Sequence, residues 1–357
     1  MTGGGGAPAR WRVVRVAARL VLCAALLSCR GPAAGAPREH FIVPKGASLR
    51  LVADSLQAHG IVTSPRTFRA AARLLGWLLP KYAGVDRHLR PGRYGFPRGE
   101  RWTVVLTALS TGRTDDQSFT VPEGATIAEI AGEAHRRLGM DSAAFVEITR
   151  EPELRERLGV PQGVRGIEGY LFPETYRVAF DAGPRQLVAH MVRQFLTVWD
   201  STWDRAADSL GMTRHQVLTL ASIVEAEAQV ASERPIIASV YLNRLKRRNP
   251  MKLQADPTVI YALGKPVRRV LLKHLNVPSP YNTYLHYGLP PGPIDSPGKA
   301  SILAVLHPAK TNFLFFVARP DGTNMFSRTA AEHADSVAVA RRLWAEAAIP
   351  DADKAPH

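Results

Sequence analysis

The pattern of hydrophobic and polar positions predicts a chain that mixes short strands with amphipathic helices. "TRHQVLTLASIVEAEAQ", residues 213 to 229, has a capping-box pattern at its start, formed by Thr213 and Gln216. Its apolar stripe has helical spacing and consists of Val217, Leu220, Ala221, Val224 and Ala228. We expect this segment to form a helix that packs against a core.

A second pattern, a strand followed by a turn and a helix, occurs twice at positions 78 residues apart. Residues 41 to 53 read "FIVPKGASLRLVA" and residues 119 to 131 read "FTVPEGATIAEIA". Alternating apolar residues predict the strand, Pro-x-Gly predicts the turn, and Ser48 or Thr126 can cap the helix. Small modules that bind cell-wall glycan, such as LysM domains, open in a similar way. A common unit that recurs because it packs well explains the repeat equally well.

These elements predict an α+β fold with several parts. Residues 38 to 117 form a small LysM-like α/β subdomain, and residues 118 to 180 form a second α/β segment. That segment ends in "GIEGYLFPETY", residues 166 to 176, a loop whose aromatic and acidic residues are typical of a lined site. A mixed α/β domain follows over residues 181 to 350.

The first thirty residues have the features of an export signal. Four arginines, up to Arg19, precede the apolar run "LVLCAALLSC", residues 20 to 29, which is short for a membrane span of roughly 20 residues. A lipid anchor at Cys29, an uncleaved membrane anchor and a cleaved signal are all open. Both cysteines, Cys23 and Cys29, lie here, so the body of the chain has no disulfide, cysteine nucleophile or thiolate metal site.

The net charge of the chain and its distribution indicate which kinds of partner to expect. There are 46 Lys and Arg against 31 Asp and Glu, a formal net charge of +15, but the basic residues are scattered. No helix-turn-helix, zinc-finger or aromatic RNA-binding pattern accompanies the charge, so we expect no nucleic-acid partner. The eleven histidines show no metal-ligand spacing, and we expect no metal.

Two carboxylates lie at the end of the predicted helix, Glu225 and Glu227. Both flank the apolar stripe, so helical geometry selects neither, and periodicity alone favours an ordinary flanking role. Glu225 shares its face with residues that cannot pair with a charge, so its pKa should be raised and it could act as a general acid. Glu227 lies about 200° away round the helix, and we expect it to be structural, with Arg234 as a candidate partner.

Five blocks in the C-terminal half decide between these interpretations. They are "ASIVEAEAQVASER" (221 to 234), "VYLNRL" (240 to 245), "MKLQADPTVIYALG" (251 to 264), "YNTYLHYGLPPGPIDSPG" (281 to 298) and "HPAKTNFLFFVA" (307 to 318). In this order, and with "LRPGRYGF" and "EGYLFPETY" before them, they resemble the YceG-like family of endolytic murein transglycosylases. The resemblance covers roughly residues 38 to 345. The segments 247 to 249 and 265 to 277 depart from the family pattern.

The resemblance implies a catalytic domain over residues 181 to 350 that cleaves peptidoglycan strands internally. It implies attachment to the bacterial inner membrane, with the body outside the cytoplasm and the cell-wall synthesis machinery as a candidate partner. The catalytic acid of the family is the glutamate that ends "SIVE", which in this chain is Glu225. Such enzymes use the C6 hydroxyl of the substrate as nucleophile and leave 1,6-anhydro ends, so that one carboxylate suffices and no cofactor is needed.

Other residues of these blocks are candidates for a sugar-binding groove. Gln254, Asp256 and Thr258 offer hydrogen bonds, and Tyr261 offers an apolar face to a sugar ring, although each also fits loop architecture. The proline-rich loop from Pro278 to Gly298, with Tyr281 and Asn282, should form a rigid wall beside the groove. Glu168 is a candidate second acid. A glycan hydrolase that pairs Glu225 with Glu168 or Asp256, and a non-catalytic glycan-binding scaffold, remain alternatives.

Overall fold

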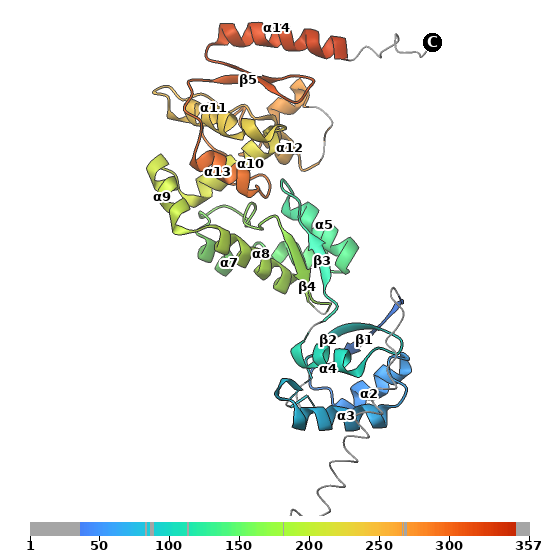
Figure 1. Cartoon of the computed structure of the whole chain (residues 1–357). Coiled ribbons are helices and arrows are strands. Elements are labelled where there is room, and N and C mark those ends of the chain that lie inside the picture. Colours follow the sequence, from blue (N-terminus) through green and yellow to red (C-terminus); the bar gives the residue numbers. More distant parts are fainter. Residues whose placement is uncertain are drawn as a thin grey trace, which may run out of the picture. The chain divides into compact units, whose positions relative to one another are not determined.

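The computed structural model describes residues 36–347, apart from residues 83, 86–88, 113, 181, 266, 268 and 269. The predicted export segment, including Cys29, lies outside the described residues. The chain divides into two compact units: unit 1 holds residues up to Ser118 with Arg177–Ala182, and unit 2 holds Phe119–Tyr176 and residues from Gly183 onward. The predicted α+β class is confirmed, because helices dominate and three small two-stranded sheets accompany them (Figure 1).

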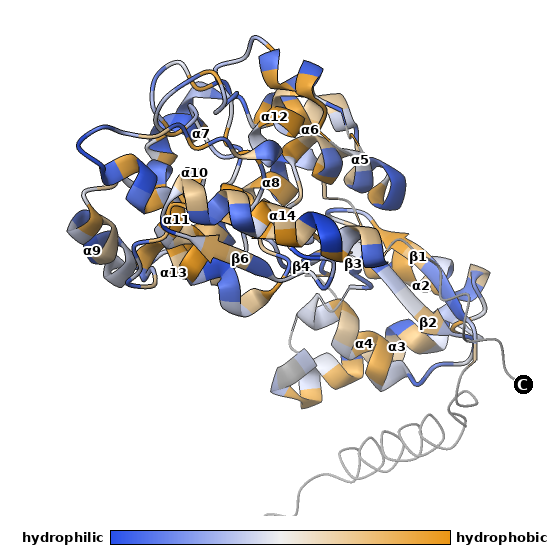
Figure 2. Ribbon diagram, turned by 90° about the horizontal axis from the view of Figure 1, so that it is seen from above, coloured by the Kyte–Doolittle hydropathy of each residue, from blue (hydrophilic) through white to orange (hydrophobic). Residues whose placement is uncertain are grey.

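Unit 1 has the order strand, helix, helix, strand, helix. Its elements are β1 (Arg38–Val43), α2 (Leu49–Ala58), α3 (Pro65–Leu78), the 3-10 turn η1 (Pro80–Tyr82), β2 (Gly92–Pro97) and α4 (Trp102–Thr111). Strands β1 and β2 pair antiparallel with Phe41 opposite Tyr94, and both rings are buried. The helices carry separate apolar and polar stretches, as the colours of α3 and α4 show in Figure 2. Their apolar sides close one hydrophobic core over the sheet.

Both copies of the repeated pattern form the predicted strand, turn and capped helix. In the first, the Ser48 hydroxyl accepts a hydrogen bond from the Leu51 N–H at the start of α2. In the second, β3 (Gln117–Thr120) leads to α5 (Ile127–Leu138), where Thr126 and Glu129 form a reciprocal capping box. Whether unit 1 is LysM-like stays a prediction.

Unit 2 holds the second copy of the pattern and most of the chain that follows it. Its further helices are α6 (Ser142–Ile148), α7 (Pro152–Leu158), α8 (Pro184–Val198), α9 (Ser201–Leu210), α10 (Arg214–Glu227), α11 (Arg234–Lys246), α12 (Asp256–Leu263), α13 (Lys299–Leu306) and α14 (Ala330–Ala347), with 3-10 turns η2 (Ala231–Glu233) and η3 (Leu272–Asn276). Strand β4 (Thr175–Val178) pairs with β3. Strands β5 (Phe315–Ala318) and β6 (Asn324–Ser327) pair antiparallel, and α14 packs on them. The predicted segment 118 to 180 therefore falls largely in one unit with the domain that follows it.

Helix α10 is the centre of unit 2 and differs from the expected one-sided helix. It begins after the N-cap Thr213, as the capping box predicted. Every residue from Val217 to Val224 is buried, because α11 and α13 pack against it and α9 and α12 cover further parts. A helix that is apolar all round is a core helix. The run of buried residues ends at Val224, and the last turn of the helix, up to Glu227, is partly exposed.

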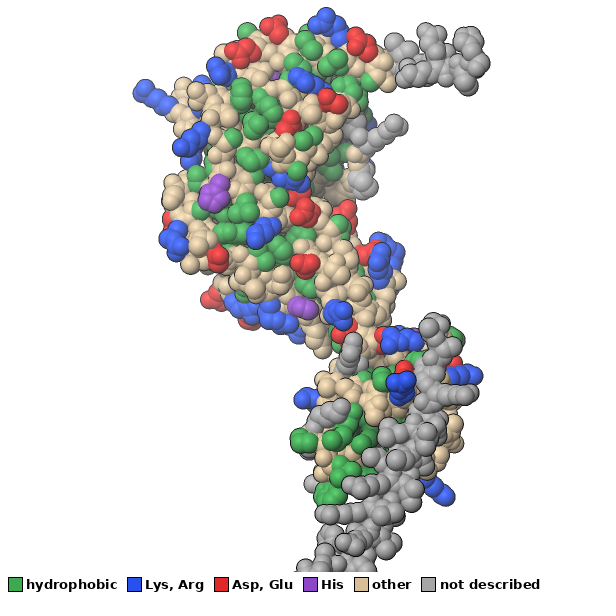
Figure 3. All heavy atoms as spheres, viewed as in Figure 1, with side chains coloured by type: hydrophobic (Ala, Val, Ile, Leu, Met, Phe, Trp, Pro, Cys, Tyr) green, Lys and Arg blue, Asp and Glu red, His purple; other side chains and the backbone are tan. Residues whose placement is uncertain are grey.

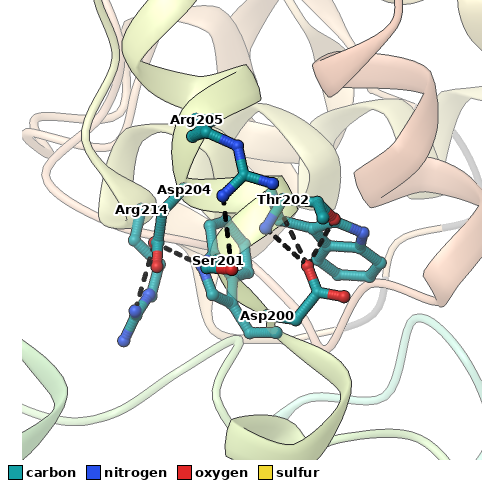
Figure 4. Close-up of polar contacts among 8 residues, drawn as sticks. Asp200, Ser201, Thr202, Asp204, Arg205 and Arg214 are labelled. Atoms are coloured by element: carbon teal, nitrogen blue, oxygen red, sulfur yellow. Dashed lines mark hydrogen bonds and ion pairs between the residues drawn. The ribbon is translucent and has the colours of Figure 1, made fainter.

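A polar cluster fixes the start of this helix (Figure 4). The Asp200 carboxylate caps α9 by accepting hydrogen bonds from the N–H groups of Thr202 and Trp203 at 2.8 and 3.2 Å. Arg214, the first residue of α10, reaches back to Asp204 on α9 at 3.2 Å. The turn between α9 and α10 is therefore held from both sides, which sets the direction in which α10 enters the core.

Helix α11, which contains the "VYLNRL" block, contacts the "HPAKTNFLFFVA" block. The Asn243 side-chain amide donates to the carbonyl oxygens of Thr311 and Phe313 at 2.9 and 3.0 Å. The buried Arg244 guanidinium donates to the carbonyl oxygen of Leu314 at 2.7 Å. These polar residues satisfy the backbone that leads into β5, so their role here is architectural.

The surface agrees with the scattered charge of the sequence. On the face shown in Figure 3, Lys and Arg side chains are spread among Asp and Glu side chains and form no continuous run. Within the described ranges, no helix has the length and apolar character needed to span a membrane.

Candidate active site

Unit 2 contains a cleft of about 1060 Å³. Its lining comes from the second copy of the repeat, the end of α6, the start of the "GIEGYLFPETY" loop with the residues before it, α12 and the proline-rich loop after Pro278, with Ala226 at the end of α10. Three predicted site residues lie in its lining, namely Glu168, Tyr261 and Tyr281. The rings of Tyr261 and Tyr281 lie 4.9 Å apart, so they form one aromatic surface on that wall. A cleft of this volume is large enough to admit part of a polymer chain.

The proline-rich loop is fastened to the buried helix α10. The Ser222 hydroxyl accepts a hydrogen bond from the Ile294 N–H at 3.0 Å. His215 Nε2 donates to the Pro291 carbonyl at 2.8 Å, and the Tyr170 hydroxyl pairs with the other ring nitrogen at 3.0 Å. Burial lowers the pKa of His215, which keeps the ring neutral and able to make both bonds. These contacts give the loop the wall-like position that the sequence predicted.

The same loop joins the second copy of the repeat. Backbone hydrogen bonds of 2.9 Å run from Gly124 N–H to the Ser296 carbonyl and from Ser296 N–H to the Ala125 carbonyl. On the other side, a Cβ at Gly169 would lie 2.6 Å from Pro293, so the turn after Glu168 packs directly on the loop. Three segments that are distant in sequence are thus fixed round one point, the end of α10.

Glu225 occupies that point. Its Oε1 accepts a hydrogen bond from Arg234 Nη2 at 3.1 Å, and its Oε2 accepts one from the Gly298 N–H at 3.0 Å. The side chain is only 7% exposed, and its methylene group faces Gly124 on the cleft wall. The expectation that this face offers no partner for a charge is wrong, because the partners come from α11 and the proline-rich loop rather than from α10.

Glu227 lies apart from Glu225, as helical geometry requires. The predicted pairing with Arg234 is wrong, since Arg234 binds Glu225 and Ser301. Glu227 instead accepts a hydrogen bond from the buried Tyr241 hydroxyl at 2.8 Å. Burial raises the pKa of Glu227 to about 7. The residue lines a separate cavity of about 280 Å³.

Glu168 is the predicted second acid, and the structure places it in the cleft. Its Oε1 accepts from the Ile127 N–H at 2.9 Å, at the start of α5, and its Oε2 accepts from the Tyr261 hydroxyl at 3.3 Å. Burial raises the pKa of Glu168 to about 7 despite these two bonds. Its carboxyl group therefore ties the second copy of the repeat to α12 and takes up a proton near neutral pH.

Two further predicted residues lie outside the main cleft but remain accessible. Asp256, the first residue of α12, accepts a hydrogen bond from the Tyr284 hydroxyl at 2.6 Å and lines the smaller cavity beside Glu227. Gln254 is exposed and has a left-handed backbone, with φ of 51°. Among the described residues other than glycine, only Gln254 has a positive φ, and such strain is common at functional sites.

Thr258 and Asn282 are placed behind the wall, not on it. Both are fully buried. The Thr258 hydroxyl bonds to the Ala255 carbonyl and the Thr283 hydroxyl at 2.7 and 2.8 Å. The Asn282 amide donates to two carbonyls at 2.9 Å, those of Leu275 and Val277. Their polar atoms are used within the protein, which fits the loop architecture considered as the alternative.

Sequence reasoning missed two acids beside Glu225. Asp295 lines the cleft and is 5% exposed, and burial with the nearby Glu225 raises its pKa well above the ordinary value. Glu123 faces Gly298, and burial and Glu225 raise its pKa while Arg234 opposes the change. The only signal for Glu123 was that the second copy of the repeat has an acid where the first has Lys45. Within the described part of the chain, no three metal-binding side chains are arranged to hold an ion.

Known proteins resemble this chain over most of its length. A Bacillus subtilis (strain 168) protein named endolytic murein transglycosylase is 33% identical over 305 residues, covering 82% of this chain and 81% of that protein. A Streptococcus pneumoniae (strain R6) protein of the same name is 29% identical over 329 residues, and the match spans 57% of its length.

The solved structures agree with these sequence matches. A 2.6 Å crystal structure of a yceG-like protein from Listeria monocytogenes superposes with a TM-score of 0.56 at 29% identity, covering 84% of this chain and 99% of that one. The profile of the YceG-like family matches residues 41–339. This chain therefore belongs to the YceG-like family.

Proposed function

We propose that unit 2 is an endolytic lytic transglycosylase that cleaves the β-1,4 bond between N-acetylmuramic acid and N-acetylglucosamine in peptidoglycan strands. The observation that carries the proposal is the position of Glu225. It is a recessed carboxyl group, held by two donors, at the point where three segments of the cleft wall meet. The curated relatives that cover most of this chain bear the corresponding name.

In the proposed reaction, Glu225 acts first as general acid and then as general base. Its proton passes to the glycosidic oxygen as the bond to C1 of the muramic acid breaks. The C6 hydroxyl of the same sugar then attacks C1, and its proton returns to Glu225, which restores the starting state. The product is a 1,6-anhydro end, and no water is added. The acetamido group of the sugar supports the positive charge that develops at C1.

The geometry provides a single carboxylate that is held in place. Arg234 Nη2 and the Gly298 N–H fix both oxygens of Glu225, so the carboxyl group is oriented before substrate enters. Arg234 is itself held by the Ser301 hydroxyl at 3.0 Å. We assign Arg234 as the positioning residue for Glu225.

A hydrolase that uses two carboxylates is the main alternative. Glu168 lines the cleft, Glu225 lies beside Gly124 of its wall, and the Glu168 pKa of about 7 is typical of a group that exchanges protons at neutral pH. Asp256 fits that alternative less well, since it lines the separate small cavity. The product separates the two reactions, because a hydrolase adds water and leaves a reducing end.

The test is digestion of purified sacculi by the full chain, followed by mass spectrometry of the released fragments. We expect anhydro ends, which are one water molecule lighter than reducing ends. Glu225→Gln keeps the shape and both donors but cannot protonate the substrate, so cleavage should fall by about a hundredfold or more. Glu227→Gln on the same helix is the matched control, and it should still release anhydro ends.

Three outcomes would contradict the proposal. Reducing ends would favour the hydrolase, and binding of sacculi without cleavage would favour the scaffold. Near wild-type turnover in a folded Glu225→Gln variant would remove Glu225 from the mechanism. Attachment of the chain to the bacterial inner membrane and glycan binding by unit 1 are part of the same proposal. The strand, helix, helix, strand order of unit 1 and the short apolar run at residues 20 to 29 support them.

A further inference from the structure

Asp295 has a buried carboxyl group in the cleft wall, and one of its oxygens lacks a hydrogen-bond partner in the part of the chain that the structure describes. The residue is 5% exposed, yet it belongs to the lining of the cleft. Among the described residues, its Oδ1 has no hydrogen-bond partner. A buried carboxyl oxygen without a partner is costly, and native structures rarely keep one without a reason. The missing partner is a reason to look for a ligand group at this position.

The charged groups that face Asp295 are acids. They are Glu225 from α10, Glu168 from the loop after α7 and Glu129 from α5. Burial and these negative charges together raise the pKa of Asp295 well above its ordinary value. The cations in the cleft lining are Arg150, Arg165 and Lys265. The neutral form has an O–H group that can donate a hydrogen bond, whereas an ionised carboxylate can only accept.

The position of this side chain is fixed by its neighbours. Ile294 on one side is bonded to Ser222 of α10, and Ser296 on the other is bonded to Gly124 and Ala125 at 2.9 Å. Oδ2 of Asp295 lies 4.0 Å from where a Cβ on Gly124 would stand, next to the methylene of Glu225. The backbone on both sides of Asp295 is therefore fixed, and its carboxyl group and the methylene group of Glu225 both face Gly124.

We propose that Asp295 is a substrate-binding residue whose neutral carboxyl group donates a hydrogen bond to the acetamido carbonyl oxygen of the sugar bound next to Glu225. This inference rests on the proposed function. An amide carbonyl can only accept, so it needs a donor from the wall. The other nearby carboxyl groups of the cleft already accept hydrogen bonds from protein donors: Glu168 from Ile127 and Tyr261, and Glu129 from Thr126. A sugar hydroxyl can donate to any of these carboxylates. The acetamido oxygen can only accept, so among the acids it can pair only with a protonated one.

The test measures binding of soluble peptidoglycan strands to the full chain, in a Glu225→Gln background that prevents cleavage. Two strand preparations are compared, one native and one chemically N-deacetylated. Asp295→Asn keeps a donor of the same shape, and Asp295→Ala removes it. We expect Asp295→Ala to weaken binding of native strands about tenfold and Asp295→Asn to bind nearly as the parent does.

A double-mutant cycle separates a contact from a structural effect. The parent and Asp295→Asn should prefer native strands over deacetylated strands, whereas Asp295→Ala should lose most of that preference. A merely structural role would weaken both preparations equally and would overturn the inference. Equal binding by all three proteins would overturn it as well. If the parent binds neither preparation, the proposed function fails and this inference with it.

A pH series gives an independent measurement. Binding of native strands to the parent should weaken as pH rises through the raised pKa of Asp295, because the group loses its donor proton and becomes a negative charge. Asp295→Asn has no proton to lose, so the difference between the two proteins should grow with pH.

Discussion

The two copies of the strand, turn and helix pattern have the same local structure and different surroundings. Gly46 and Gly124 occupy equivalent turn positions with φ of 77° and 76°. Ser48 and Thr126 both cap the helix that follows. A Cβ at Gly46 would meet nothing within 4 Å, whereas a Cβ at Gly124 would lie 3.8 Å from Cγ of Glu225. The same turn is thus open surface in one copy and part of the candidate active site in the other.

The difference lies in what the rest of each unit brings to the turn. In unit 2, the proline-rich loop pairs with residues 124 and 125, and the Glu168 carboxylate binds the first N–H of α5. In unit 1, α2 has no acidic residue in its first turn, and Lys45 is exposed. Local sequence sets local structure, and distant segments decide whether a turn becomes a site. Four predictions test this comparison.

The largest expected effect is on the pH dependence of stability of unit 2. The folded pKa of Glu168 is about 7, above an unfolded value of 4.5, so its contribution is fully present below pH 4.5 and is lost as pH rises through 7. The loss amounts to about 3 kcal/mol at most, at 1.36 kcal/mol per unit. We expect Glu168→Gln, which keeps an acceptor for Ile127, to reduce the fall in stability between pH 5 and pH 8 in urea unfolding of the full chain.

Other buried acids of unit 2 determine how much the stability of the Glu168→Gln variant still depends on pH. Asp295 and Glu227 also have raised pKa values, so some dependence on pH should persist in the variant. The unfolding transition of unit 1 is the internal control, because Glu168 belongs to unit 2. A Glu168→Gln protein with an unchanged pH profile would show that Glu168 is already ionised well below pH 7.

The second prediction exchanges the residues that differ between the turns. Glu123→Lys gives the second copy the lysine of the first and brings a cation next to Glu225, where it competes with Arg234. Cleavage of sacculi should fall about tenfold, which corresponds to about 1.4 kcal/mol in the barrier. Lys45→Glu is the reciprocal control and should cleave as the wild type does. Equal activity in the two variants would mean that the charge at position 123 does not reach the site.

The third prediction uses the equivalent glycines. Alanine at a left-handed position costs roughly 1 to 2 kcal/mol, so Gly46→Ala and Gly124→Ala should destabilise their own units by similar amounts. The contacts that the new methyl would make at position 124 are ordinary in length, but they lie between Glu225 and Asp295. Only Gly124→Ala should therefore lower cleavage, by several-fold, under conditions where both proteins are folded. Loss of activity in Gly46→Ala would contradict the comparison.

Much of the fold follows from the sequence, because it depends on local patterns. The capping residues Thr213 and Thr126, the turn glycines and the apolar stripe of α10 each depend on residues a few positions apart. The sequence did not predict that α10 would be buried all round, since the covering helices come from other parts of the chain. Periodicity says which face is apolar and says little about how many neighbours pack on it.

The candidate site could be predicted only in part for the same reason. Glu168, Tyr261 and Tyr281 were identified from loop composition and family resemblance, and they do line the cleft. The partners of Glu225 are 9 and 73 residues away in sequence, so no pattern on α10 could reveal them. Asp295 is one acid in a loop of prolines and glycines, and only its burial distinguishes it.

The smallest expected effect concerns the two helix caps. Thr126→Ala and Ser48→Ala each remove the side-chain acceptor at the start of a helix, which costs about 1 kcal/mol in the unit concerned. The two losses should be similar in urea unfolding, because each hydroxyl accepts one backbone N–H at the start of its helix. They should differ in binding, since Thr126 lines the cleft and Ser48 belongs to unit 1. Without the Thr126 hydroxyl, Glu129 keeps the bond from the backbone N–H of residue 126 but loses the one from the hydroxyl at the cleft wall, so Thr126→Ala should weaken strand binding slightly and Ser48→Ala should not. If both variants bind equally well, the turn of the second copy supports the site only through its backbone, and the difference between the copies resides in Glu123 and Gly124 alone.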